Sequence, residues 1–168
     1  AAGPANAPVT LVEYGDYECS HCGAAHPIVL SIRKQFAGTL RFVFRNFPLR
    51  EAHPHAAHAA EAAEAVAELG GNESFWKMHD LLYDNQDALD DESLVRYATS
   101  AGVDGDMVRN ALAARTYSPR VRADFNSGVR SGVNGTPTFF INGVRFDGNW
   151  QDEDDFAAAL EAAAADHR

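Results

Sequence analysis

Two cysteines, Cys19 and Cys22, are the residues best suited to chemistry, because they are the only thiols in the sequence and only Ser20 and His21 separate them. The motif follows an apolar, β-branched run and stands where a helix is expected to begin. Residues three apart on a helix lie on one face, so we expect the two sulfurs close enough to form a disulfide with little backbone movement. So short a loop stabilises a fold poorly, because the entropy removed from the unfolded chain grows with loop length. The spacing therefore indicates a redox couple.

The two thiols are expected to differ in acidity. Unpaired N–H groups at a helix N-terminus stabilise an anion, so the pKa of Cys19 is predicted to fall below its usual value and Cys22 to act as the resolving thiol. A protonated His21 would add a positive charge that favours the reduced, thiolate form. Stabilising the reduced form makes the disulfide a stronger oxidant. Metal ligation and an inert structural pair are the alternatives.

A β-α-β unit is predicted around this motif. Residues 9–14 (VTLVEY) and 40–47 (LRFVFRNF) have the composition and spacing of strands, and residues 19–36 carry helical spacing that ends near Gly38. The order implies parallel strands joined by a right-handed crossover.

The middle of the chain is predicted to be entirely helical. Alanine-rich residues 54–69 form one helix that stops at Gly70-Gly71, and Asn72 or Ser74 is expected to cap the next. Shorter helical patterns follow at 92–100 and 106–114. About 65 such residues are too many for a connection, so we predict an inserted helical subdomain at 52–117.

The two flanking segments, residues 1–51 and 118–168, are predicted to form one discontinuous α/β domain. After residue 117 the expected elements are a helix at 118–129, strands at 138–141 and 144–146 joined by an Asn142-Gly143 turn, and a closing helix at 152–167.

Composition narrows the functional class. The chain has 168 residues, 46% of them hydrophobic, which suffices for one substantial core. Its net charge of −10 repels phosphate backbones and anionic lipid, so nucleic acid is not an expected partner. The absence of any further thiol suits an oxidising compartment, and a start at Ala1 is compatible with a trimmed precursor. An extracytoplasmic location, periplasm or cell envelope, is therefore favoured, with the cytoplasm as the alternative.

Several runs together are similar to one known family, the DsbA-like thiol-disulfide oxidoreductases of the thioredoxin superfamily. The resembling residues are VEYGDYEC at 12–19, His21-Cys22, FRNFPL at 44–49 and GVNGTPTF at 132–139. The resemblance implies an α/β thioredoxin-like fold interrupted by an inserted all-helical subdomain. It also implies that Cys19 is the attacking nucleophile, that Cys22 resolves, and that Thr136-Pro137 forms a cis-proline loop facing them.

Glu13 resembles the buried acid that assists deprotonation of the resolving cysteine in thioredoxin-like proteins, although an exposed glutamate at a sheet edge is the alternative. A cis bond before Pro137 would expose the Thr136 backbone to an extended substrate peptide, whereas an ordinary trans proline at a strand start is the plainer interpretation. One departure concerns Ser20, because strong oxidants of this family usually carry proline there, which leaves the redox potential open.

The predicted function is a protein-disulfide oxidoreductase, most simply a monomeric dithiol oxidase that introduces disulfides into reduced or unfolded proteins. No cofactor or metal is expected, and a redox partner such as a membrane quinone-linked oxidase would restore the disulfide. The alternatives are a reductase of the same fold, a metal-binding protein that uses the two cysteines and nearby histidines, and an interaction module with inactive cysteines. His55 and His58, which share a helix face, are a separate candidate pair for a metal such as zinc or copper, with exposed polar residues at a helix start as the plainer interpretation.

Overall fold

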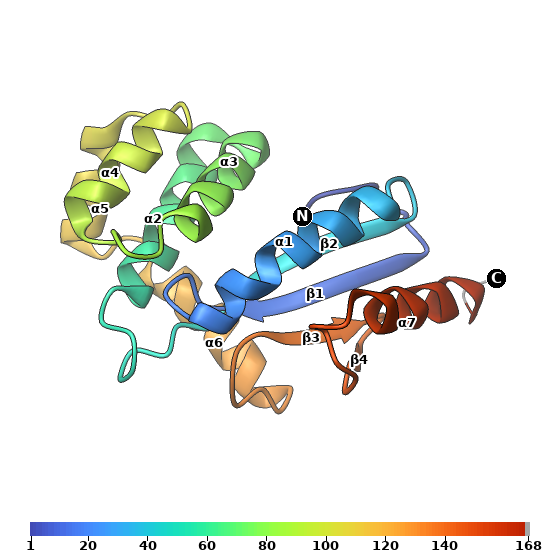
Figure 1. Ribbon diagram of the computed structural model, residues 1–168. Coiled ribbons are helices and arrows are strands. Elements are labelled where there is room, and N and C mark those ends of the chain that lie inside the picture. The colour runs from blue at the N-terminus through green and yellow to red at the C-terminus, as the bar shows by residue number, and fades with distance from the viewer. Residues whose placement is uncertain (167–168) are drawn as a thin grey trace.

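A four-stranded mixed sheet forms the centre of the molecule in the computed structural model, which describes residues 1–166 (Figure 1). The strands are β1 (Val9–Gly15), β2 (Leu40–Asn46), β3 (Thr138–Ile141) and β4 (Val144–Arg145), in the order β2-β1-β3-β4. β1 and β2 are parallel, whereas β3 runs antiparallel to β1 and to β4. Helix α1 (Ser20–Gln35) connects β1 to β2, which confirms the expected β-α-β unit.

Each face of the sheet packs against helices because apolar residues alternate along its strands. Leu11 and Phe139 lie in a cluster with Phe156 of α7 (Glu153–Asp166), on the face that α1 also covers. Their neighbours Val12 and Phe140 lie in a second cluster on the α6 side, the helix of residues Ser118–Arg130. The sequence-predicted final helix extended to His167, which lies outside the described residues.

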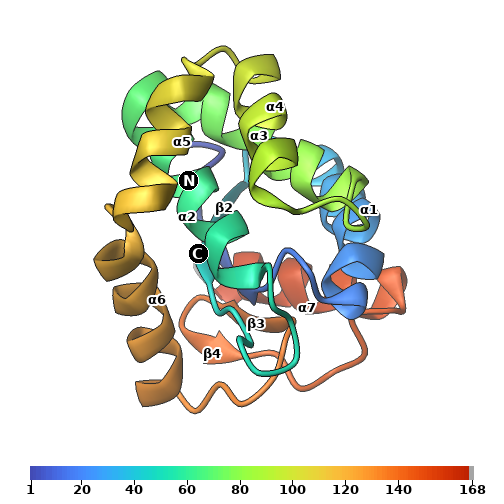
Figure 2. The ribbon, with the colours of Figure 1, turned by 90° about the vertical axis from the view of Figure 1, so that its left-hand side faces the viewer.

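The middle of the chain forms four helices that gather at one end of the sheet (Figures 1 and 2). They are α2 (Ala56–Gly70), α3 (Asn72–Asp84), α4 (Asp91–Ser100) and α5 (Gly105–Ala114). The fold is thus a thioredoxin fold with an inserted helical subdomain, as predicted. The boundaries at residues 52 and 117 stay a prediction.

The start of α3 differs from the expectation. Its N-cap is Gly71, with φ 87°, and neither Asn72 nor Ser74 takes that position. Gly71 is also the C-cap of α2, so one residue in the left-handed region joins two consecutive helices. A side chain at this backbone angle would be strained, which explains why glycine serves here in place of a polar cap.

Helix α3 packs against α1, β2 and the connection that leads into α1. The Arg33 guanidinium of α1 lies 4.8 Å from the ring centroid of Trp76, and the Trp76 ring contacts Phe42 of β2. Nearby, the buried Tyr17 hydroxyl is hydrogen-bonded to Nδ1 of His79 at 2.8 Å. Among residues 1–166, no helix combines the length and apolar character that crossing a bilayer requires.

Phe156 is predicted to be the side chain that most directly supports β3. It is fully buried, and its ring centroid lies 4.9 Å from those of both Phe139 and Phe146. Phe156→Ala should lower the free energy of unfolding by about 3–5 kcal/mol, measured by urea denaturation. Val129→Ala, at an exposed position, is the control and should change it by less than about 0.5 kcal/mol. Equal effects in the two variants would contradict this packing account.

Candidate active site

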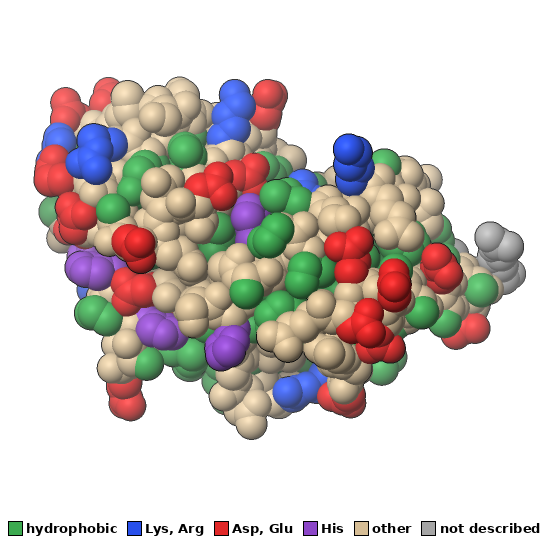
Figure 3. Space-filling view, in the orientation of Figure 1, with side chains coloured by type: hydrophobic (Ala, Val, Ile, Leu, Met, Phe, Trp, Pro, Cys, Tyr) green, Lys and Arg blue, Asp and Glu red, His purple; other side chains and the backbone are tan. Residues whose placement is uncertain are grey.

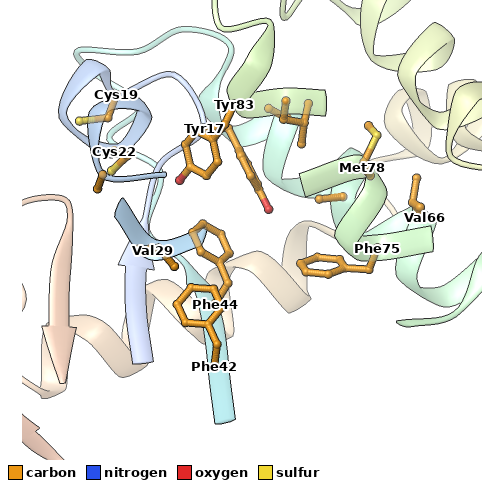
Figure 4. Close-up of a cluster of buried hydrophobic side chains, with 14 of the residues drawn as sticks. Tyr17, Cys19, Cys22, Val29, Phe42, Phe44, Val66, Phe75, Met78 and Tyr83 are labelled. Atoms are coloured by element: carbon orange, nitrogen blue, oxygen red, sulfur yellow. The ribbon is translucent and has the colours of Figure 1, made fainter. Parts of the chain in front are cut away.

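The two cysteines lie at the point where β1 leads into α1 (Figure 4). Cys19 is the N-cap residue of α1, with extended backbone angles, and Cys22 lies in the first turn. Both are free thiols and both are buried, Cys19 with 6% of its surface exposed and Cys22 with none. The structure therefore gives one thiol a narrow opening to solvent and encloses the other.

The surroundings shift the two pKa values in opposite directions. The pKa of Cys19 is lowered to about 5, first by a hydrogen bond from the Cys22 thiol, against the opposing effect of burial. The Thr136 side chain and the backbone N–H groups of Cys22 and His21 stabilise the same thiolate. Burial raises the pKa of Cys22 far above its usual value, and the hydrogen bond with Cys19 adds to this. In the reduced pair, Cys19 therefore holds the negative charge and Cys22 keeps its proton.

His21 contributes to the Cys19 thiolate through its backbone, a contribution that the sequence did not predict for this residue. Its side chain is exposed, and its contribution to the low pKa of Cys19 comes from the backbone N–H at the helix start. Any residue other than proline supplies that donor. The stabilising charge predicted for its imidazole stays a prediction.

The loop before β3 faces the cysteine pair. The Thr136–Pro137 peptide bond is cis, and the Cys19 thiol donates to the Thr136 carbonyl with 3.7 Å between sulfur and oxygen. Thr138 Oγ1 donates to the carbonyl of Gly135 at 2.7 Å, which closes the turn. Thr136 Oγ1 is buried without a hydrogen-bond partner in the described part of the chain. This hydroxyl is available to donate to a thiolate at Cys19.

Glu13 occupies the middle of the sheet, since its strand neighbours are Phe44 of β2 and Phe139 of β3. Only 2% of its surface is exposed, so it is not the exposed edge residue of the alternative interpretation. Its Oε2 has no hydrogen-bond partner among residues 1–166. Burial, and then the charge of Cys19, raise the pKa of Glu13 to about 8. At neutral pH this carboxyl group is therefore mostly protonated and holds a proton next to the thiol pair.

Gln86, which follows α3, fixes the backbone that leads into the motif and was missed by sequence reasoning. Its Nε2 donates to the carbonyls of Tyr17 and Cys19, at 2.9 and 2.8 Å. Gly23 makes this approach possible, because a Cβ there would lie 2.1 Å from Gln86 Oε1. Gly23, a glycine within the first turns of the predicted helix, was the one feature of the sequence that could have indicated a close approach of another segment. Nothing in the sequence pointed to its partner.

Two further histidines, His53 and His58, have acidic partners. His58 Nδ1 lies 2.8 Å from Asp91 Oδ1, and His53 Nδ1 lies 2.7 Å from Asp16 Oδ2. Over residues 1–166 the structure brings together no three His, Cys, Asp or Glu side chains in an arrangement able to hold a metal ion.

The first prediction from this geometry concerns the thiolate. Absorbance of the reduced protein near 240 nm should titrate with a midpoint of about 5. Cys22→Ala removes the strongest stabilising hydrogen bond and should raise that midpoint by roughly one unit or more. Cys19→Ser should lack the transition altogether. A wild-type midpoint near the free value of about 8.5 would contradict the assignment.

The second prediction concerns Glu13. An unfolded glutamate releases its proton near pH 4.3, whereas the folded one keeps it to about pH 8, so wild-type stability should fall as the pH rises between these values. Glu13→Gln cannot lose this proton, so its stability relative to wild type should increase from pH 5 to pH 8.5. Urea denaturation of the reduced proteins, kept reduced throughout, tests this, with the exposed Glu68→Gln as control. Parallel pH profiles for Glu13→Gln and wild type would refute it.

Comparison with known proteins finds similarity over nearly the whole chain. The sequence matches the model of a family described as Thioredoxin over residues 1–162. The structure is similar to BdbD from Bacillus subtilis in its oxidised form, with a TM-score of 0.89 and 27% identity, covering 97% of this chain and 91% of that one. It is also similar in fold to the thiol-disulfide exchange protein alpha-DsbA2 from Wolbachia pipientis, with a TM-score of 0.80 and 23% identity over 96% and 84% of the two chains.

A curated relative carries a different kind of name. The chain is 45% identical over 163 residues to "Na(+)/H(+) antiporter NhaA 3" of Salinispora tropica, which covers 97% of this chain. The chain spans about a quarter of the length of the curated relatives it matches, 24% for this one. Three observations indicate the same family. They are the family match, the cysteine pair at the start of α1 and the proline loop that faces this pair. This chain belongs to the DsbA-like thiol-disulfide oxidoreductase family of the thioredoxin superfamily.

Proposed function

We propose that this chain catalyses thiol-disulfide exchange with protein substrates and works as a dithiol oxidase. The proposal rests on one observation: the pKa of Cys19 is lowered, whereas the pKa of Cys22 is raised. A Cys19 thiolate with a pKa of about 5 is stable in the reduced pair, and stabilising the reduced form makes the oxidised form a better electron acceptor. The environment of Cys19 therefore supports the oxidising direction of exchange.

The first step is attack on Cys19, the more exposed of the two sulfurs. A substrate thiolate bonds to Cys19 Sγ, the Cys19–Cys22 bond breaks, and its electron pair leaves with Cys22. Burial makes a thiolate at Cys22 unfavourable, so Cys22 takes up a proton. Glu13, protonated at neutral pH and buried close enough for its charge to affect the pKa of Cys22, is the proposed source of that proton.

The second step releases the substrate as a disulfide. Another substrate thiolate attacks the substrate sulfur of the mixed disulfide, and Cys19 leaves with the electron pair. A thiol with a low pKa is a good leaving group, so the Cys19 environment speeds this step as well. Two electrons have then passed from the substrate dithiol to Cys19 and Cys22.

The Thr136–Pro137 loop is the proposed contact for the substrate peptide. It carries the carbonyl that accepts from Cys19, so a chain whose cysteine reaches Cys19 also reaches the backbone of Thr136. An extended peptide is held well by such backbone hydrogen bonds, which do not depend on its sequence. Broad acceptance of reduced or unfolded proteins is expected.

Continued turnover requires a redox partner that takes the two electrons. We propose a membrane quinone-linked oxidase, an extracytoplasmic site of action and a monomeric state for this chain. The reductase alternative uses the same residues in reverse and is favoured only if the disulfide proves hard to reduce. The name of the Salinispora protein refers to transport by a longer chain. That protein is about four times as long as this one, and this sequence matches 24% of it.

Activity and trapping test the mechanism together. The oxidised protein should restore disulfides in a reduced, unfolded ribonuclease, and Cys19→Ser should abolish this by at least about a hundredfold, because the attacked sulfur is gone. In Cys22→Ser, the Cys19 thiolate attacks a disulfide of an oxidised substrate protein and releases one substrate thiolate; without Cys22 the resulting mixed disulfide cannot be resolved and should accumulate, seen by mass spectrometry under non-reducing conditions. Retained oxidation in Cys19→Ser would refute the mechanism.

Direction is decided by the potential. Equilibration with glutathione should give a value on the oxidising side of about −200 mV. A value near −270 mV, in the range of thioredoxin, would favour the reductase alternative.

A further inference from the structure

A buried carboxylate, that of Asp16, joins the cysteine motif to a distant loop. Asp16 lies three residues before Cys19, and its side chain is completely buried. Its Oδ1 accepts from the backbone N–H of Glu18 at 2.8 Å, and its backbone carbonyl accepts from the N–H of Cys19 at 3.1 Å. Its Oδ2 accepts from the N–H of Leu49 at 2.9 Å and lies 2.7 Å from His53 Nδ1. These bonds hold the turn that presents Cys19.

The loop on the other side of Asp16 runs from the end of β2 to α2 and lies beside the start of α1 (Figure 2). A second contact supports the same junction, since Glu18 Oε1 accepts from the N–H of His55 at 3.3 Å. A buried carboxylate is costly unless it is paired and fully hydrogen-bonded. His53 supplies the cationic partner, and with 23% of its side chain exposed it can exchange protons with solvent.

The charges around His53 favour its protonated form. Burial alone would lower its pKa, but the hydrogen bond and negative charge of Asp16 outweigh burial, and the charges of Cys19 and Glu18 add to them, so the pKa of His53 is raised. These three groups all come from the β1–α1 connection. The other ionisable residues on its own loop, Arg50, Glu51 and His55, are exposed.

Thermodynamic linkage makes this effect mutual. If a thiolate at Cys19 favours protonated His53, then protonated His53 favours the thiolate by the same free energy. Figure 3 shows histidine side chains gathered on the face around the start of α1 and the loop before α2, while lysine and arginine side chains on that face lie elsewhere. In a chain of net charge −10, protonated His53 thus adds a positive charge that interacts with the charge of Cys19.

We propose that Asp16 and His53 form a positioning pair for Cys19, in which Asp16 fixes the reactive turn and the imidazolium of His53 anchors the loop and stabilises the Cys19 thiolate. The pair rests on the proposed function of Cys19 and adds its regulation by pH. As the pH rises past the titration of His53, the imidazole becomes neutral and the reduced form loses part of its stabilisation. Above that pH, the disulfide should therefore be a weaker oxidant than it would be if the charge of His53 did not change with pH.

Four proteins test this pair: wild type, His53→Asn, His53→Lys and His58→Asn. Asparagine can donate to Asp16 in place of Nδ1 but carries no charge, and lysine restores a positive charge that does not titrate near neutral pH. His58→Asn is the matched control, because His58 makes the same kind of contact, Nδ1 to Asp91 Oδ1 at 2.8 Å, on α2. The measurement is the rate of Cys19 alkylation by iodoacetamide from pH 4 to pH 9.

In His53→Asn the apparent pKa of Cys19 should rise by roughly half a unit to one unit, which lowers the alkylation rate at pH 4.5 by about three- to eightfold. His53→Lys should restore the wild-type value, and His58→Asn should match wild type throughout. A purely structural role for His53 would alter stability but leave this profile unchanged. Identical profiles for His53→Asn, His58→Asn and wild type would overturn the proposal.

The same proteins separate this proposal from the proposed function. Alkylation of Cys19 reports the thiolate whether or not the protein oxidises substrates. If oxidised wild type fails to exchange with glutathione, the proposed function fails while the alkylation profile still decides the role of His53. If exchange is normal and His53→Asn has the wild-type profile, only the positioning pair is refuted.

Discussion

The hydrogen bond between the Cys19 and Cys22 sulfurs is the interaction on which the remaining chemistry depends. It is the largest stabilising contribution to the Cys19 thiolate, and it works because Cys22 is too deeply buried to give up its proton. Burial thus acts on the two thiols unequally. Cys19 becomes a stable anion and a good leaving group, whereas Cys22 becomes a proton donor. Two identical side chains thus take different roles.

Three segments far apart in sequence hold this asymmetry in place. Gln86, from the inserted helical region, fixes the carbonyls of Tyr17 and Cys19. Asp16 joins the turn before Cys19 to the loop before α2, and the loop before β3 supplies Thr136. The insertion therefore does more than cover one end of the sheet. Through a single glutamine it sets the geometry of the backbone at which α1 begins.

Much of the fold and part of the site could be predicted from local pattern. Strand 138–141 and the start of α6 at Ser118 agree with the structure because apolar spacing and turn residues act over a few positions. The expected polar cap of α3 was wrong, since chain direction between two packed helices required Gly71. Gln86 and the Asp16–His53 contact were missed because they join residues 37 or more positions apart, and no local pattern reports such pairs.

The dependence of the reduction potential on pH tests the central claim most directly. If Cys19 is a thiolate and Cys22 a thiol above pH 5, reduction takes up two electrons and one proton, so the potential should fall by about 30 mV per pH unit between pH 6 and pH 8. Below pH 5 both sulfurs bind protons, and the slope should approach about 59 mV per unit. A slope of about 59 mV per unit throughout would show that Cys19 stays protonated at neutral pH and would contradict the account.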